Sequence, residues 1–305
     1  MTAKSEAERE GLATMGLRPL TAKEFRLFQE LIQKSAGIFL SEVKKALLVG
    51  RLARRLRECG VDSFTAYHER VLEDPVELAT MIDCICTNET HFFREQQHWR
   101  LLEERILPAW RREAEAGVRQ ARVRVWSAAC STGEEPYSLA MTLLENLPGW
   151  TVEILATDLS NKVLAAAREG LYRIEKSAEI PRRLLRRYML KGTGSQLGKM
   201  KVGDEIANVV RFTRANLSHQ PIAVVGRFDL VFCRNVLIYF TAEGRERVAR
   251  EMLSRLEPEG YLFLGHAETL NGPGESVRTV IPTVYCQAPA PAAPGLHGAG
   301  RAVAK

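Results

Sequence analysis

Two adjacent carboxylates, Glu134 and Glu135, begin a helix directly after a strand and a tight loop. The strand-forming run Val123–Ala128 passes through small residues to Gly133, and Pro136 suits a first helical turn, where its missing N–H costs nothing. A strand, a loop and a helix N-terminus form the geometry of a nucleotide-binding crossover.

The loop does not look like a dinucleotide site, because it contains one glycine where such a site needs several. Two carboxylates in the first turn would repel a pyrophosphate, whereas they suit a cationic ligand such as S-adenosylmethionine, with its ammonium and sulfonium groups. Glu134 and Glu135 could equally serve only to complement the helix dipole. The loop by itself leaves both interpretations open.

A third carboxylate, Asp158, ends the next predicted strand, Val152–Asp158. At that place it can accept hydrogen bonds from both ribose hydroxyls, or it can cap the helix that opens at Ser160. Its position at a strand end, in step with the first loop, favours ribose binding. Asn216 and Leu217 follow a later strand, where an amide can meet an adenine edge.

Arg234 and Asn235 end the apolar strand Phe228–Asn235. Burying them without partners would cost several kcal/mol, so we expect them to face a cleft. The carboxyl ends of parallel strands meet at one edge of a sheet, where open α/β folds bind ligands. We therefore expect all these residues at one site.

Strands and helices alternate from Val123 onward, which predicts a mostly parallel sheet with right-handed crossovers. A turn at Pro258–Gly260 should lead into strand Tyr261–Gly265, and the closing strand Thr279–Cys286 should be antiparallel. Between Gly170 and Phe212 the alternation stops. That segment, with a helical stretch at Ile180–Leu190 and short runs at Met200–Val202 and Ile206–Val210, predicts a small β insertion.

The N-terminal part predicts a small all-helical unit over residues 21–86. A capping box at Thr21–Glu24 starts the first helix, which ends near Gly37, and Ser41 can cap a second that runs to Cys59. Ser63 and Asp74–Pro75 begin two more helices.

The second helix carries six basic and two acidic residues between Ser41 and Gly60. Lys44, Arg51 and Arg55 fall within a narrow arc, so one side should pack and the other present cations. Such a stripe is either a solvated face or a docking surface for an acidic partner.

Residues Thr87–Arg94 break the helical pattern and predict an interdomain linker. Phe92 and Phe93 would be costly to leave in water, so the linker should be pinned to a surface. A further helix should start at Glu95 and be kinked or ended by Pro108.

The composition is that of a globular protein: 305 residues, 46% hydrophobic and 26% charged, with net charge +6 and pI near 9.0. Six irregularly spaced cysteines and six scattered histidines predict neither disulfides nor a metal site. Met1–Leu20 lacks signal-peptide character and no apolar run is long enough to cross a bilayer, which predicts a cytoplasmic protein that is not an integral membrane protein.

Two other functions share this fold. A nicotinamide-dependent oxidoreductase should have a glycine-rich first loop, which is missing here. A nucleic-acid methyltransferase or RNA binder would explain the basic helix, but that helix has no aromatic residue to stack on bases between Ser41 and Gly60.

Four segments resemble the chemotaxis receptor glutamate methyltransferase family, CheR: Thr87–Arg94, Ser127–Ser138, Phe232–Phe240 and Gly265–Glu268. Their order and spacing agree with the family, and the likeness covers roughly Thr21 to Gln287.

The resemblance implies an α/β fold: a doubly wound, Rossmann-like class I methyltransferase domain with an inserted small antiparallel β subdomain, preceded by a small all-α domain. It divides the chain into a flexible N-terminus (1–20), a receptor-docking helical domain (21–86), a linker contacting the cofactor (87–94), an S-adenosylmethionine-binding domain (95–287, insertion about 171–212) and a disordered tail (288–305).

The implied activity is transfer of methyl from S-adenosylmethionine to glutamates of methyl-accepting chemotaxis receptors, bacterial sensory proteins whose cytoplasmic domain is an acidic helical coiled coil. S-adenosylhomocysteine is the other product. Some family members also hold a receptor tail peptide with the β subdomain, and the sequence leaves open whether this one does.

The resemblance also implies the site residues. The cofactor-binding set is Asn88, Thr90, Arg94, Glu134 or Glu135, Asp158, Asn216, Leu217, Asn235 and Val236. Substrate docking falls to Lys44, Lys45, Arg51, Arg54 and Arg55.

The chemistry needs neither a metal nor a strong general base, because the methyl on a sulfonium is already activated and a carboxylate is a competent nucleophile. The protein must hold carboxylate oxygen, methyl and sulfur in line within ~3–3.5 Å. We expect Arg94 and Tyr239 to orient the incoming carboxylate, with Arg234 as a helper.

Overall fold

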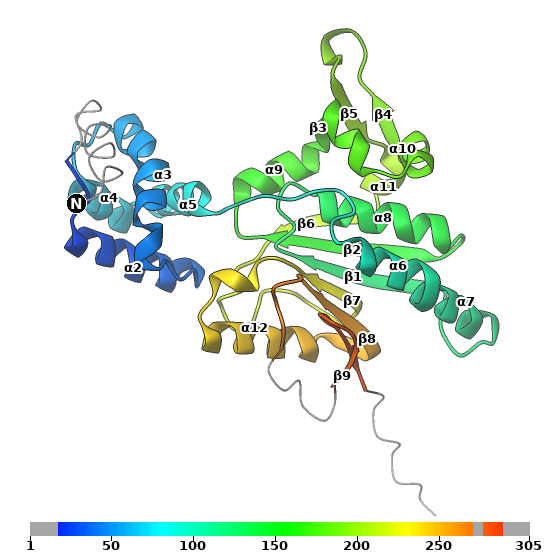
Figure 1. The fold of residues 1–305 in the computed structure, drawn as a ribbon. Coiled ribbons are helices and arrows are strands. Elements are labelled where there is room, and N and C mark those ends of the chain that lie inside the picture. The colour runs from blue at the N-terminus through cyan, green and yellow to red at the C-terminus, as the bar shows by residue number, and fades with distance from the viewer. Residues whose placement is uncertain (1–17, 271–276, 289–305) are drawn as a thin grey trace, which may run out of the picture.

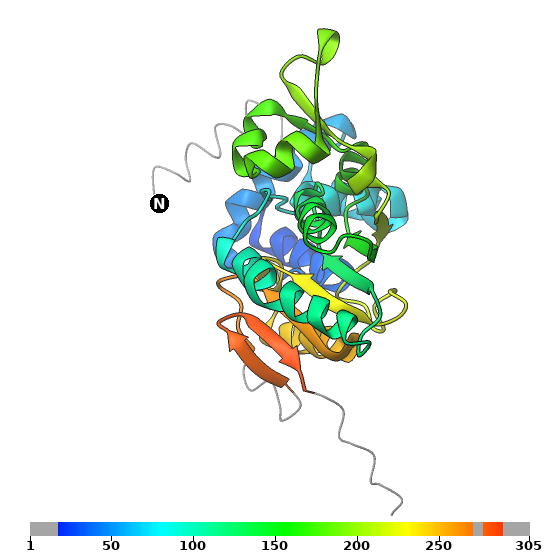
Figure 2. The same cartoon turned by 90° about the vertical axis from the view of Figure 1, so that its right-hand side faces the viewer.

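The computed structural model describes residues 18–270 and 277–288 (Figure 1). The predicted flexible N-terminus, apart from residues 18–20, and the predicted tail from residue 289 lie outside the described residues. A helical unit at the N-terminal side is connected by an extended segment to an α/β unit, from which a smaller sheet projects (Figures 1 and 2).

The helical unit has four α-helices, each with apolar residues on the side that faces the others. They are α2 (Ala22–Ala36), α3 (Lys45–Glu58), α4 (Phe64–Glu73) and α5 (Pro75–Ile85). Thr21 forms the predicted capping box with Glu24, and Ser63 and Asp74 cap α4 and α5 through their side chains. These three starts are confirmed. The prediction for Ser41 was wrong in detail, because the chain first forms a 3₁₀ turn, η1 (Glu42–Lys44), without a side-chain cap.

The linker leads into helix α6 (Gln96–Leu101), a π-helical turn (Leu102–Ile106) and α7 (Leu107–Glu115). Phe92 and Phe93 are 2% and 3% exposed, which confirms that the linker is pinned. The helix does not end at Pro108. The widened turn just before it shifts the hydrogen-bond pattern, so that Pro108 falls in the first turn of α7, where no N–H is required.

The main sheet has the strand order β6-β2-β1-β7-β8-β10-β9. Its strands are β1 (Arg122–Ala128), β2 (Thr151–Asp158), β6 (Val210–Arg214), β7 (Phe228–Cys233), β8 (Leu256–Leu264), β9 (Val277–Ile281) and β10 (Val284–Gln287). The first five in that order are parallel, and β10 is antiparallel to both of its neighbours. The predicted doubly wound, mostly parallel sheet is confirmed.

Alternate side chains of the central strands point to two different cores. Val125 and Phe232 pack with α6, α7 and α8 (Glu134–Asn146) on one face. Trp126 and Val231 pack with α12 (Ala242–Ser254) on the other. α9 (Asn161–Glu169) lies beside α8 over β2 and β6 (Figure 1). This period-2 pattern fixes the register of each strand.

The inserted segment forms a three-stranded antiparallel sheet of β3 (Leu171–Arg173), β5 (Lys199–Val202) and β4 (Met189–Lys191), with α10 (Arg182–Tyr188) packed beside it. The predicted β insertion is therefore present. The run Ile206–Val210 does not belong to it, because residues 204–207 form helix α11 and Val210 starts β6 of the main sheet.

Two C-terminal predictions were wrong. Strand β8 begins at Leu256 and absorbs the predicted turn at Pro258–Gly260 as an irregularity in its pairing with β7. The single predicted strand Thr279–Cys286 is a hairpin of β9 and β10, because Thr283 adopts a positive φ of 66° and reverses the chain.

Candidate functional site

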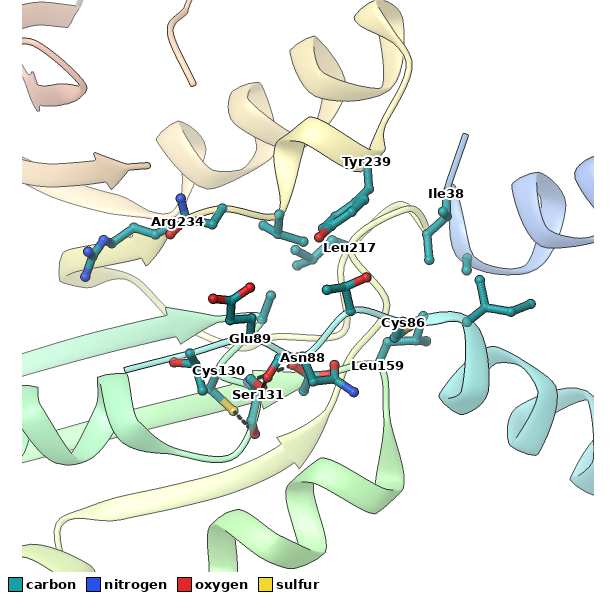
Figure 3. Close-up of a pocket in the computed structure, with 18 of the residues that line it drawn as sticks. Ile38, Cys86, Asn88, Glu89, Cys130, Ser131, Leu159, Leu217, Arg234 and Tyr239 are labelled. Carbon is teal, nitrogen blue, oxygen red and sulfur yellow. Dashed lines mark hydrogen bonds between the residues drawn. The ribbon is translucent and has the colours of Figure 1, made fainter. Parts of the chain in front are cut away.

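One pocket of about 210 Å³ lies where the helical unit, the linker and the carboxyl edge of the main sheet meet (Figure 3). The segments that follow β1, β2, β6 and β7 all line it. The expected convergence of these four strand ends is confirmed. It follows from the parallel pairing of β6, β2, β1 and β7, which places their carboxyl ends at one edge.

Asp158 lines this pocket and is 8% exposed. One carboxylate oxygen accepts the Ser131 N–H at 2.9 Å, and the other accepts the Ser160 N–H at 3.0 Å. Burial raises the pKa of Asp158 above its ordinary value, against these hydrogen bonds. Asp158 therefore supports the start of α9 and lines the pocket at once, and each oxygen can accept a further bond.

The two adjacent glutamates have different surroundings. Glu135 lines the pocket and accepts a hydrogen bond from the Ser127 hydroxyl at 2.7 Å. Burial raises the pKa of Glu135, while Arg234 counteracts this in part. Glu134 is 1% exposed and pairs with Lys176 Nζ at 2.6 Å.

Glu134 therefore does not line the pocket, and of the two alternatives that the sequence left open the geometry favours Glu135 as the cofactor ligand. Consecutive residues of a helix point about 100° apart, so that only one of the two can face the pocket. The other pairs with Lys176 of the inserted segment, a contact that no local pattern of residues indicates.

Arg234 lines the pocket with part of its side chain but extends its guanidinium away from Tyr239 (Figure 3). That guanidinium is buried between Glu95, at 3.2 Å, and Glu135, at 3.3 Å, and also donates to the Arg94 carbonyl. The expected help of Arg234 in orienting the substrate stays a prediction, and in this structure its guanidinium is already engaged. Buried charges need partners, and these two carboxylates take up its donors.

Asn235 and Val236 form a turn held by one buried carboxylate. Glu268 is 4% exposed and accepts backbone N–H groups from Asn235 at 2.8 Å, Leu237 at 2.7 Å and Gly265 at 2.7 Å. Asn235 itself has a positive φ of 59°. Glu268 belongs to the Gly265–Glu268 motif, but its role was not predicted, because the partners are backbone groups that carry no sequence signal.

Positive φ values outside glycine gather around this site. Besides Asn235, Ala129, Ser131, Phe93 and Glu95 have φ values of 60°, 49°, 52° and 64°. Such conformations are unfavourable for side-chain-bearing residues and persist where the surroundings impose them. The loops and the linker are thus fixed in shape around the pocket.

Asn216 and Leu217 line the pocket after β6, as expected. The Asn216 amide donates to the Ser35 carbonyl of α2 at 2.8 Å, and its oxygen accepts from the Ser218 N–H at 3.0 Å. Asn216 therefore ties the helical unit to the sheet. One amide hydrogen stays available for a ligand.

The linker residues Asn88, Thr90 and Arg94 also line the pocket. The Asn88 carbonyl accepts from the Ser131 hydroxyl at 3.1 Å, and the Thr90 carbonyl accepts from Lys176 Nζ at 3.0 Å. Arg94 donates to the Glu89 carbonyl at 3.4 Å. The Ser131 hydroxyl thus ties the linker to the loop that follows β1, and Lys176 ties it to the inserted segment.

Tyr239 directs its hydroxyl into the pocket from the turn after β7 (Figure 3). Lys44 Nζ lies 5.3 Å from the centre of the Tyr239 ring, a cation–π distance. The helical unit therefore contributes to the same end of the pocket as Tyr239.

The predicted basic stripe on α3 is only partly exposed. Arg51 donates to the Cys86 carbonyl at 2.7 Å and to the Thr87 hydroxyl at 3.0 Å, and Arg55 pairs with the buried Glu77. Hydrogen bonding to Arg55 lowers the pKa of Glu77. Arg51 and Arg55 are thus internal to the helical unit, because the end of α5 and Glu77 need these donors. Lys45 is half-buried, and Arg54 is exposed beside Glu58.

Several pocket residues were not predicted. They are mainly apolar side chains of the helical unit and of the loops: Ile38, Leu40, Cys86, Leu159 and Phe240. Apolar residues of this kind are equally common in protein cores, and no sequence motif distinguishes those that line a pocket.

In the two described ranges, 18–270 and 277–288, no helix is long and apolar enough to cross a membrane. No group of three or more metal-binding side chains comes together within the same residues.

Two family models match the chain. The one described as "CheR methyltransferase, SAM binding domain" matches residues 88–286, and "CheR methyltransferase, all-alpha domain" matches residues 23–86. Among curated relatives, Chemotaxis protein methyltransferase 2 of Pseudomonas aeruginosa is 38% identical over 270 residues, covering 88% of this chain and 94% of the relative. The Chemotaxis protein methyltransferase of Salmonella typhimurium is 40% identical over 258 residues, covering 83% and 85%. The corresponding protein of Borreliella burgdorferi is 36% identical, covering 87% and 94%.

Proposed function

Since the chain belongs to the CheR methyltransferase family and is an S-adenosylmethionine-dependent methyltransferase, we propose that it methylates glutamate side chains of methyl-accepting chemotaxis receptors. One observation carries the proposal: the carboxylates of Glu135 and Asp158 line the same pocket as Arg94 and Tyr239. The carboxylates suit a cationic, ribose-bearing ligand. The arginine and the tyrosine suit an acidic acceptor.

The residues of the pocket fit S-adenosylmethionine. Glu135 can hold its ammonium group, because its carboxylate lines the pocket and shares the Arg234 guanidinium with Glu95. Asp158 has acceptor capacity for ribose hydroxyls. Leu217 and Phe240 provide apolar surface for the adenine beside the Asn216 amide. When bound, the cofactor supplies a methyl group activated by its sulfonium.

The chain's own residues then have two tasks. The Arg94 guanidinium can form charge-assisted hydrogen bonds to the incoming glutamate carboxylate, and the Tyr239 hydroxyl can donate a second bond that fixes its rotation. Both side chains come from segments held by backbone hydrogen bonds, so little ordering remains when the substrate arrives. Closing the pocket removes water from the carboxylate and makes it more nucleophilic.

The substrate protein would be an acidic helical coiled coil in the cytoplasm, and we infer that this enzyme acts there too. The exposed cation of Arg54 and the half-buried Lys45 support attraction of such a partner. Lys44 adds a positive charge at the pocket itself.

A second receptor contact through the β subdomain is also part of the proposal. The subdomain projects from the main sheet, its outer strands are β3 and β4, and Leu190 on β4 is 58% exposed (Figure 1). An extended receptor tail could add to one of these edges. Titration of a labelled tail peptide, with a scrambled peptide as control, tests this contact separately from catalysis.

The main test is direct. The protein is incubated with methyl-labelled S-adenosylmethionine and purified receptor cytoplasmic domains, and label released by mild base is counted as methyl ester. We expect ester on glutamates, and about 100-fold slower turnover in Arg94→Ala, since misplacement of the acceptor costs that order of rate. Label on nucleic acid instead of the receptor would contradict the proposal, and unchanged turnover in Arg94→Ala would remove Arg94 from its role.

A further inference from the structure

Four large apolar side chains are exposed on segments that lie next to the pocket. Phe39 is 50% exposed, Val43 91%, Leu47 42% and Ile238 47%. We call these four residues the apolar rim. Apolar side chains that gather in one exposed place mark a surface that another molecule covers.

The rim residues come from distant parts of the chain but border the same site. The Phe39 N–H donates to the Tyr239 carbonyl at 2.7 Å, which places Phe39 beside the turn that contains Ile238. Val43 and Leu47 are one helical turn apart, and Lys44 between them lies over the Tyr239 ring. Leu47 and Tyr239 line the same pocket. The rim residues therefore belong to segments that lie next to Tyr239.

The opposite side of the mouth is polar. Glu89 and His91 of the linker have side chains that are 75% and 47% exposed. Both line the pocket with Arg94. A molecule that covers the mouth thus meets apolar groups on one side and charged or polar groups on the other.

We propose that the apolar rim docks an apolar stripe of the substrate helix, next to the glutamate that is methylated. The inference rests on the proposed function and adds which features of the substrate helix the enzyme recognises. A glutamate side chain is short, so its helix must lie directly over the mouth for the carboxylate to reach Arg94 and Tyr239. A helix in that position covers the rim, so that the rim side chains are no longer exposed to water.

The hydrogen bonds of two arginines on α3 support the assignment of the apolar rim as the docking surface. Arg51 and Arg55 donate to partners within the helical unit, so fewer of their donors are free to contact the substrate. Charge then attracts the acidic partner at long range, while the rim supplies affinity and register at short range. The substrate class is a helix that is acidic overall and has small or apolar residues on one side of the accepting glutamate.

The test compares two double variants in the receptor methylation assay. Phe39→Ser/Val43→Ser removes two rim side chains that do not line the cofactor pocket. Leu72→Ser/Val76→Ser removes two residues of the same helical unit that are 61% and 75% exposed on α4 and α5. We expect the rim variant to raise the KM for the receptor domain about tenfold, as loss of about 1.4 kcal/mol of contact requires. Its kcat at saturating receptor and its S-adenosylmethionine affinity should stay at the wild-type values.

An unchanged KM in the rim variant, or an equal rise in the control variant, overturns the proposal. These results are distinct from failure of the proposed function, in which the wild-type protein itself would methylate no receptor domain. Circular dichroism and thermal melting of both variants establish that they are folded, which is expected because all four residues are exposed.

Discussion

A single guanidinium, that of Arg234, serves two carboxylates beside the pocket. It is 2% exposed and lies 3.2 Å from Glu95 and 3.3 Å from Glu135. Because Glu135 shares this guanidinium with Glu95 and also lines the pocket, the cluster can accommodate a ligand cation close to Glu135. We therefore expect Arg234 to act as a positioning residue, which affects the cofactor through Glu135.

Replacing each of the adjacent glutamates by glutamine in turn should separate their roles. Glu135→Gln should weaken S-adenosylmethionine binding by about 10- to 100-fold, since a charge-assisted hydrogen bond contributes about 1.5–3 kcal/mol. Glu134→Gln should leave binding nearly unchanged and lower the melting temperature, because Lys176 loses a buried partner. Calorimetric titration and thermal melting distinguish the two. Equal losses of affinity would contradict the assignment.

The raised pKa of Glu135 also predicts a pH dependence. The carboxylate must be ionised to hold an ammonium group, and burial makes it protonate at a higher pH than an ordinary glutamate does. Cofactor affinity should therefore fall on acidification before ordinary carboxylates titrate. Binding titrations across that pH range should show that the affinity for S-adenosylmethionine falls with decreasing pH in the wild type. The affinity should depend less on pH in Glu135→Gln. A wild-type affinity that stays constant down to the ordinary range would refute the expectation.

Short elements shape the pocket through backbone groups. The turn after β7 carries Asn235 and Tyr239, and Glu268 fixes it by accepting the N–H groups of residues 235, 237 and 238. In the helical unit, α3 and α5 are joined by the Arg55–Glu77 pair, to which Tyr67 of α4 donates a hydrogen bond at 2.7 Å. The carboxylates of Glu268 and Glu77 thus hold neighbouring elements together without a bound ligand.

Glu268→Gln should loosen the turn, because an amide is a weaker acceptor for several buried N–H groups. We expect a loss of about 2–3 kcal/mol in the free energy of unfolding and roughly tenfold weaker cofactor binding. Glu243→Gln, an exposed residue of the first turn of α12, is the matched control and should change neither quantity. Wild-type stability and cofactor binding in Glu268→Gln would show that the turn keeps its conformation without the Glu268 carboxylate.

The Arg55–Glu77 pair predicts acid sensitivity of the helical unit. Hydrogen bonding to Arg55 lowers the pKa of Glu77 below 4.5, so the pair stabilises the folded state above that pH. The stabilisation is lost as the pH falls through the folded-state pKa. Arg55→Met should cost about 1–3 kcal/mol at neutral pH and reduce the acid dependence of unfolding. Arg54→Met removes only an exposed pair, and its unfolding curve should match the wild type.

The pocket exists because two units meet closely. Gly37 ends α2 with a φ of 70°, and a Cβ there would lie 2.5 Å from Ser218 Cβ and 2.8 Å from Phe240 Cε1. Only glycine allows both this conformation and this approach. The Asn216–Ser35 hydrogen bond and the Phe39–Tyr239 backbone bond join the units at the same place. Cofactor affinity is thus a property of the whole assembly.

Gly37→Ala should push the units apart and weaken cofactor binding about tenfold. Gly60→Ala provides a matched control, since Gly60 has a φ of 67° but nothing within 4 Å of an added Cβ. Both variants bear the same backbone penalty of roughly 1 kcal/mol, so the difference between them reports the contact between units. Calorimetry gives both affinities, and equal values would contradict a pocket that depends on this approach.

The sequence determined the order of the elements and most of their limits. Capping residues such as Thr21, Ser63 and Asp74, and the strand–loop–helix pattern around Gly133, act locally, so their effect can be read from neighbouring residues. The convergence of four strand ends also followed, because parallel pairing leaves little choice of edge. Predictions were wrong where local signals were short, as at Ile206–Val210 and Thr279–Cys286.

The tertiary structure alone decided which charged groups face the ligand. Glu134, Arg51, Arg55 and Arg234 looked like binding residues in the sequence, but each is engaged by a partner that is distant in the chain. A buried charge is stable only beside its partner, and that partner is chosen by packing between elements. Tertiary packing also brought the apolar rim to the mouth of the pocket, which no residue pattern had indicated.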